Sequence, residues 1–327
     1  MSPNDPERFA GPDGSRYPDP RARFAAQQQR LLAHYGVGAV SRHVHLARPA
    51  LRVHLLEAGR GEPLVIFHGG DGQGIDWAPL MAPLQRDFRV YAVDRPGFGL
   101  SDPFDYRRVD LRSHAAEVVD SLLDALGLDS ATLIGGSMGG FFALAAALAR
   151  PERVRRLILV GMPAGMSTDC PLPLRLACAI PGATHLMMRR LARPTTEPRR
   201  QQYRQMFKAD LAKIPEAYFE MQRAGLAIPG APETWAVLLR RVAGLRGMRP
   251  EITLTAELPR IAQPVLVLWG ERDMTPVEGG RAATARIPGA RFVVIDGVGH
   301  FPFLEAPERC AMLIREFAGL RRDPLAA

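Results

Sequence analysis

The stretch ATLIGGSMGGFFALAAALA, residues 131–149, decides the fold of this 327-residue chain. Its apolar beginning is typical of a buried β-strand, and its end is typical of a helix. Between them lies Gly-Gly-Ser-Met-Gly, so we expect a sharp turn from strand to helix with Ser137 at its tip. The glycines allow strand and helix to approach without Cβ collisions. The turn would place the Ser137 hydroxyl at a helix N-terminus, where the helix dipole favours negative charge.

Short apolar runs alternate with helical stretches on both sides of this turn. The runs at 63–70 and 153–161 are typical of buried strands, and residues 111–126 are patterned as a helix. Later in the chain, PVLVLWG and ARFVVIDG predict two more strands, followed by a helix at 307–320. This alternation predicts an α/β fold with a mostly parallel sheet flanked by helices.

Residues 163–262 interrupt the α/β pattern and are helical, punctuated by proline and rich in Arg, Met and aromatic residues. We therefore predict an inserted helical cap at 163–262, within a core formed by 41–162 and 263–327. Residues 1–40 should form an N-terminal tail and a helix. Several large apolar side chains suggest a pocket in the cap, although core packing is the commoner explanation at helical spacing: Met187, Met188, Met206, Phe207, Tyr218, Phe219 and Trp235.

The net charge of +8 comes mainly from scattered arginines, which argues against a nucleic-acid partner. The denser arginines at 189–204 and 240–249 are expected on a solvated face. Cysteine occurs three times without a CxxC spacing, so neither disulfides nor a zinc site are expected. We see no signal-peptide pattern and no apolar stretch long enough to span a bilayer. These features predict a soluble, cytoplasmic protein without a membrane partner, and its oligomeric state stays open.

A serine hydroxyl needs a base and an orienting group to act as a nucleophile. His300 lies in a loop between the last predicted strand and the last helix, and Asp273 lies just beyond the preceding strand. The order Ser137, Asp273, His300 is the order in which this architecture carries a catalytic triad. Rival carboxylates remain, because three other acids also lie near strand ends: Glu271, Asp296 and Asp169.

Acyl transfer also needs hydrogen-bond donors for the developing oxyanion. The backbone N–H groups of Gly70, in the loop FHGGDGQG, and of Met138 are the candidates. We expect His68 to have a structural role that ties this loop by hydrogen bonds. The glycines and proline of DRPGFGLSD, at 94–102, indicate a turn that shapes the floor of the pocket.

With these motifs in order, the chain resembles the α/β-hydrolase superfamily over nearly all of residues 42–320. The resemblance rests on HGG, DRPGFGLSD, GGSMGG, WGERD and GHFPFLEAPE. It implies a helical cap after the sixth strand, no metal or cofactor, and a covalent acyl-enzyme on Ser137. Haloalkane dehalogenases and epoxide hydrolases of this superfamily have aspartate at the position of Ser137, so those activities are disfavoured.

We expect a serine hydrolase that cleaves a carboxylic ester of a small apolar substrate, and two alternatives stay open. The HGGDG and SMGG motifs also resemble the meta-cleavage product hydrolases, which break C–C bonds. Those enzymes usually have asparagine at the position of Gly136, tryptophan at that of Phe301, and a cap arginine with which Arg223 is not clearly in register. The third hypothesis is a small-molecule receptor that keeps the fold without turnover.

Overall fold

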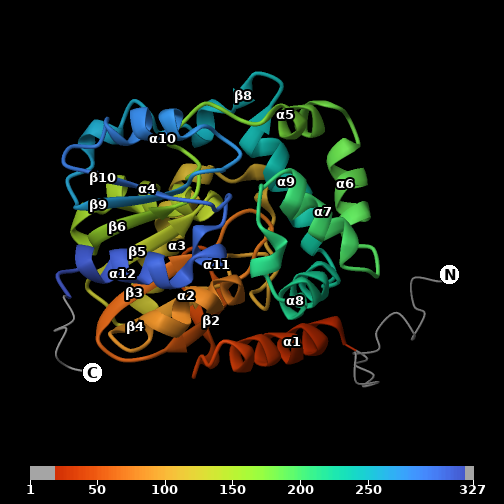
Figure 1. Ribbon diagram of the computed structural model, residues 1–327, viewed down its shortest axis with the longest axis horizontal. Helices are drawn as coiled ribbons and strands as arrows, with labels where there is room; N and C mark the ends of the chain where they lie inside the picture. Colours follow the sequence, from red (N-terminus) through yellow and green to blue (C-terminus); the bar gives the residue numbers. More distant parts are fainter. Residues whose placement is uncertain (1–18, 321–327) are drawn as a thin grey trace.

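An eight-stranded sheet forms the centre of the computed structural model, which describes residues 19–320 (Figure 1). The strands lie in the order β1-β2-β4-β3-β5-β6-β9-β10. The pairs β1–β2 and β2–β4 are antiparallel, and every later neighbouring pair is parallel. The predicted mostly parallel sheet is confirmed. Its strands are β1 (Val40–Leu46), β2 (Leu51–Ala58), β3 (Glu62–Phe67), β4 (Phe88–Val93), β5 (Ala131–Gly136), β6 (Val154–Val160), β9 (Val265–Gly270) and β10 (Arg291–Ile295).

The central strands are apolar throughout because both faces of the sheet are buried. Successive side chains of a strand point to opposite faces. In β3, Leu64 and Ile66 belong to one core cluster, whereas Val65 and Phe67 belong to the other. Burial on both faces is the pattern expected of parallel strands in α/β proteins.

Helices cover the two faces of the sheet. On one face, α3 (Leu111–Ala125) and α4 (Met138–Ala149) contribute side chains to the same core cluster. The other face is covered by α2 (Ala78–Leu84), α11 (Pro302–Glu305) and α12 (Pro307–Phe317). A further helix, α10 (Val277–Thr284), connects β9 to β10. The predicted helices at 111–126 and 138–149 are confirmed, and the one at 307–320 ends earlier, at Phe317.

Residues 163–262, called the insertion below, are mainly helical and lie beside the sheet, on the right of Figure 1. A small β7–β8 hairpin near the end of this stretch was not predicted, because its strands are two residues each. The insertion contains α5 (Leu172–Ala179), α6 (Ala183–Leu191), α7 (Glu197–Gln205), α8 (Glu216–Leu226), α9 (Ala231–Val242), β7 (Ala243–Gly244) and β8 (Gly247–Met248).

The predicted N-terminal helix is α1 (Pro20–His34), and it packs against α8 of the insertion (Figure 1). Phe24 and Leu31 of α1 are fully buried in one cluster with Phe219. Asp19 caps the helix by accepting a hydrogen bond from the Arg21 backbone N–H. The predicted tail falls on residues 1–18, outside the described residues. Within residues 19–320, no helix combines the length and apolar character needed to cross a bilayer.

Candidate active site

Ser137 lies between the end of β5 and the start of α4 in a strained backbone conformation. Its φ of 48° and ψ of −115° are unusual for a residue with a side chain. A Cβ at Gly139 would overlap the carbonyl of Phe67, so the tight turn requires glycine there. Met138 is the first residue of α4, where a backbone N–H has no partner within the helix. The turn therefore holds the Ser137 hydroxyl beside a free N-terminal donor.

His300 and Asp273 meet at the carboxyl edge of the sheet. The His300 Nδ1 atom is 2.8 Å from the Asp273 Oδ1 atom, and both side chains are almost fully buried. A carboxylate can only accept, so in the neutral imidazole Nδ1 carries the proton and Nε2 has the lone pair. The insertion holds this histidine, because the His300 backbone N–H donates to the Phe207 carbonyl at 2.9 Å and the two rings stack.

The three rival carboxylates lie elsewhere. Asp169 and Asp296 are exposed. Glu271 accepts a hydrogen bond from the Gly297 backbone at 2.8 Å. Among these candidates, Asp273 is the acid that the structure brings to His300.

The loop after β3, which contains Gly69 and Gly70, passes close to Ser137. A Cβ at Gly69 would lie 3.0 Å from the Ser137 Cβ, so the loop passes directly across the turn. Gly70 has a φ of 21°, and it lines the same cavity as Ser137 and Met138. The two proposed oxyanion donors and the serine therefore share one cavity.

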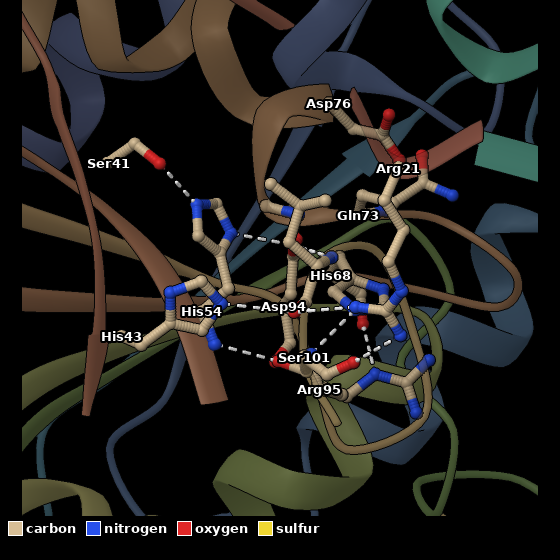
Figure 2. A network of polar contacts seen from close by, with 12 residues as sticks. Arg21, Ser41, His43, His54, His68, Gln73, Asp76, Asp94, Arg95 and Ser101 are labelled. Carbon is tan, nitrogen blue, oxygen red and sulfur yellow. Dashed lines mark hydrogen bonds and ion pairs between the residues drawn. The ribbon is translucent and has the colours of Figure 1, made fainter. Parts of the chain in front are cut away.

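A buried network behind this loop fixes its shape (Figure 2). Burial lowers the pKa of His68 to about 3, so its ring is neutral. His68 Nδ1 donates to the Gly69 carbonyl, and Nε2 accepts from the Arg95 backbone N–H. The Arg95 guanidinium donates to the carbonyls of His68, Gly69 and Gly70 at 3.1, 3.3 and 2.6 Å. These hydrogen bonds agree with the structural role expected of His68.

The DRPGFGLSD turn at 94–102 carries this network and does not line the cavity, so the expected contribution to the pocket floor is wrong. Asp94 also accepts from His54 at 2.7 Å, and His54 Nε2 lies 2.7 Å from the hydroxyl of Ser41 (Figure 2). Ser41, His54 and Asp94 thus form a Ser–His–Asp chain of hydrogen bonds outside the candidate site. Ser41 lies within strand β1, away from the cavity, and therefore has no turn at a helix N-terminus beside it.

The cavity over Ser137 and His300 lies between the core and the insertion. Its walls are largely apolar: the core contributes Trp77, Met162 and Phe303, and the insertion contributes Leu174, Met187 and Trp235. Within residues 19–320, no Arg or Lys lines this cavity. As expected, most of the seven large apolar side chains of the cap pack in hydrophobic clusters, and five of the seven also line the cavity: Met187, Met206, Phe207, Tyr218 and Trp235.

One end of the cavity is polar, which the sequence patterns did not predict. Asp71 and Asp76 line this end on the core side, while Gln202, Tyr203, Tyr218 and Gln222 face them from the insertion. Asp76 accepts hydrogen bonds from the Gln73 backbone at 2.9 Å and from the Gln222 amide. Arg223, the arginine considered from sequence, pairs with Glu220 at 2.6 Å and does not line the cavity.

The family model described as "alpha/beta hydrolase fold" matches residues 62–307. The chain belongs to the α/β-hydrolase fold family. Among curated relatives of this α/β hydrolase, a 2-hydroxy-6-oxononadienedioate/2-hydroxy-6-oxononatrienedioate hydrolase of Paraburkholderia phymatum is 30% identical, covering 86% of this chain and 96% of the relative. A 2-hydroxy-6-oxo-6-phenylhexa-2,4-dienoate hydrolase of Comamonas testosteroni is 31% identical, covering 81% and 90%.

Solved structures agree on the fold. A carboxylesterase from Bacillus subtilis superimposes with a TM-score of 0.72 at 22% identity, covering 91% of this chain and 98% of that chain. A 2-hydroxy-6-oxo-6-phenylhexa-2,4-dienoate hydrolase from Rhodococcus also gives 0.72, at 23% identity, with coverages of 86% and 99%. Both the esterase and the C–C hydrolase have this fold, so the fold alone does not distinguish their activities.

Proposed function

We propose that this α/β hydrolase cleaves carboxylic esters of small, uncharged and largely apolar molecules. The observation that carries the proposal is the cavity that Ser137 and His300 share, whose walls are apolar and, in the part of the chain that the structure describes, contain no Arg or Lys. An uncharged ester can enter such a cavity without the loss of charge hydration that an anion would suffer. The insertion acts as the cap that selects the substrate.

In the proposed reaction, His300 Nε2 removes the proton of the Ser137 hydroxyl while the oxygen attacks the ester carbonyl carbon. The N–H groups of Gly70 and Met138 donate to the oxyanion. The C–O bond then breaks, and His300 returns the proton to the departing alcohol. A water molecule attacks the acyl-enzyme with His300 again as base, which releases the acid and restores Ser137. Asp273 holds the imidazole in the tautomer that both steps need.

C–C bond hydrolysis is the second candidate, favoured by the two dienoate hydrolases at 30 and 31% identity. Two features of this chain speak for the ester. A Cβ at position 136 would lie 2.7 Å from the Trp77 ring, so Gly136 leaves no room for a polar side chain there. A dienoate carboxylate would meet the carboxylate of Asp71 at the polar end and no cation among the described residues of the cavity wall.

Turnover and labelling together test the proposal. We expect hydrolysis of 4-nitrophenyl butyrate or hexanoate, and covalent labelling of Ser137 by a fluorophosphonate located by peptide mapping. Ser137→Ala should lose both, whereas Ser41→Ala should keep both because Ser41 has no oxyanion donors beside it. Faster turnover of a 2-hydroxy-6-oxodienoate than of any ester would establish the C–C hydrolase instead. Stoichiometric stabilisation by a ligand, without labelling or turnover, would favour the receptor hypothesis.

We propose that the protein binds a small molecule, and neither nucleic acid nor a membrane, and that it is located in the cytoplasm. The three cysteines support that setting because all are buried, free thiols.

A further inference from the structure

The polar end of the cavity is closed by an ion pair between the core and the insertion. Asp71, in the loop after Gly70, accepts a hydrogen bond of 2.7 Å from the guanidinium of Arg199 in α7. The Arg199 side chain is only 2% exposed. Asp71 itself lines the cavity, whereas Arg199 lies behind the wall. The negative partner of the pair therefore faces the substrate.

The guanidinium of Arg199 lies close to several other groups at this end. Its Nη1 atom donates to the Gln202 side chain at 2.7 Å, and Gln202 lines the cavity. Its Nε atom is buried without a hydrogen-bond partner among the described residues. Behind the wall there is thus a cation with unused donor capacity, whose charge Asp71 neutralises.

We propose that Asp71 is a specificity-determining residue: by engaging Arg199, it keeps the polar end of the cavity from binding carboxylate-bearing substrates. This inference rests on the proposed function and names the class of ester that the site accepts. A substrate carboxylate at this end would have to displace Asp71 from Arg199, leaving one carboxylate buried without a counterion. An uncharged ester forces no such exchange.

The isosteric change Asp71→Asn tests the role of the charge. It removes the negative charge but keeps an oxygen that can accept from Arg199, so the guanidinium becomes available to an incoming anion. The measured quantity is the ratio of kcat/KM for mono(4-nitrophenyl) adipate to kcat/KM for 4-nitrophenyl hexanoate, which have equal acyl length. We expect this ratio to rise about 10- to 100-fold, as for a hydrogen bond to a charged group. A second ester pair should carry the carboxylate on the alcohol side.

Two controls separate the local pair from general effects. Asp169→Asn makes the same change of charge at an exposed site and should leave the ratio unchanged. Adding Arg199→Met to Asp71→Asn should cancel the gain. If Asp71→Asn fails to fold, Arg199→Met alone tests the ion pair. This variant leaves the charge of Asp71 without its partner. It should therefore raise the turnover of an ester that bears an ammonium group relative to that of its neutral analogue.

Binding of hexanoate provides a readout that does not depend on hydrolysis. By calorimetry, Ser137→Ala/Asp71→Asn should bind hexanoate at least about tenfold more tightly than Ser137→Ala. If the parent protein hydrolyses neutral esters but neither ratio nor hexanoate affinity changes, this inference fails and the proposed function stands. If no ester is hydrolysed but hexanoate binding tightens, the proposed function fails and the role of Asp71 stands.

Discussion

The guanidinium of Arg95 donates a 2.6 Å hydrogen bond to the carbonyl of Gly70, the residue whose N–H we propose as an oxyanion donor. Arg95 is completely buried. Its guanidinium lies over the rings of Phe98 and Phe142, and these cation–π contacts hold the guanidinium plane. Because the carbonyls of residues 68–70 all point to Arg95, the peptide planes of the loop are held from behind. Arg95 is therefore a positioning residue for the proposed oxyanion hole.

Arg95→Lys should lower kcat for a neutral ester by about 10- to 100-fold with little change in KM. A lysine keeps the charge but cannot bind several carbonyls in one plane, and oxyanion donors act in the transition state rather than in substrate binding. Arg241→Lys is the matched control, since Arg241 binds the carbonyls of Tyr106 and Val109 away from the cavity. Steady-state kinetics gives kcat and KM, and thermal unfolding checks that the variants are folded. A rise in KM alone would contradict the positioning role of Arg95.

Asp273→Asn should lower kcat by about 10⁴-fold, because an amide favours the wrong imidazole tautomer. The fold should persist, since the substitution changes no volume. Asp169→Asn, an equal change at the exposed rival carboxylate, should leave kcat unaltered. Steady-state kinetics of both variants on one ester measures this contrast. If only Asp169→Asn lost activity, Asp273 would not be the acid of the triad.

The sequence was sufficient for the features that local patterns determine. The turn around Ser137 is encoded within a few residues, because glycines, an apolar strand and an apolar helix must adjoin there. The chain order also placed Asp273 and His300 beyond the ends of β9 and β10, and the structure brings these two side chains together.

The polar end of the cavity was missed because its contacts join distant segments. Asp71 and Arg199 are 128 residues apart, and the density of arginines at 189–204 indicated only a solvated face. The role of Arg95 was not predicted for a different reason. Its partners are backbone carbonyls, which have no signature in the sequence, and its glycine-rich surroundings indicated only a turn.

Gly139→Ala should destabilise the protein by about 1–3 kcal/mol, the usual effect of overpacking. The added methyl group would overlap the Phe67 carbonyl in β3, and strand backbone cannot move aside as a flexible side chain can. Gly279→Ala is the matched control near the start of α10, where the nearest atom to the new Cβ is 4.0 Å away. It should be neutral or stabilising by up to about 1 kcal/mol. Urea unfolding of both variants measures the contrast.

Asp76 should make the stability of the protein fall as pH rises from about 4 to about 7. Burial raises its pKa from 3.8 to about 7, outweighing the hydrogen bond from the Gln73 backbone and the charge of Arg199. Between these two pH values the folded state retains a proton that the unfolded state has released. The folded state is therefore favoured below pH 4, and this advantage is lost once the pH exceeds the pKa in the folded state.

The difference in unfolding free energy between the parent protein and Asp76→Asn isolates this group. His68 and His114, whose pKa values burial lowers to about 3 and about 4, titrate in both proteins and cancel in the difference. The asparagine side chain has one hydrogen-bond acceptor fewer than aspartate. This loss changes the unfolding free energy of the variant by an amount that does not depend on pH. We expect the parent to lose up to about 4 kcal/mol relative to the variant between pH 4 and pH 8, at about 1.4 kcal/mol per pKa unit. Urea unfolding at unit pH intervals measures this slope, and a difference that stays constant with pH would mean that Asp76 is already ionised at pH 4.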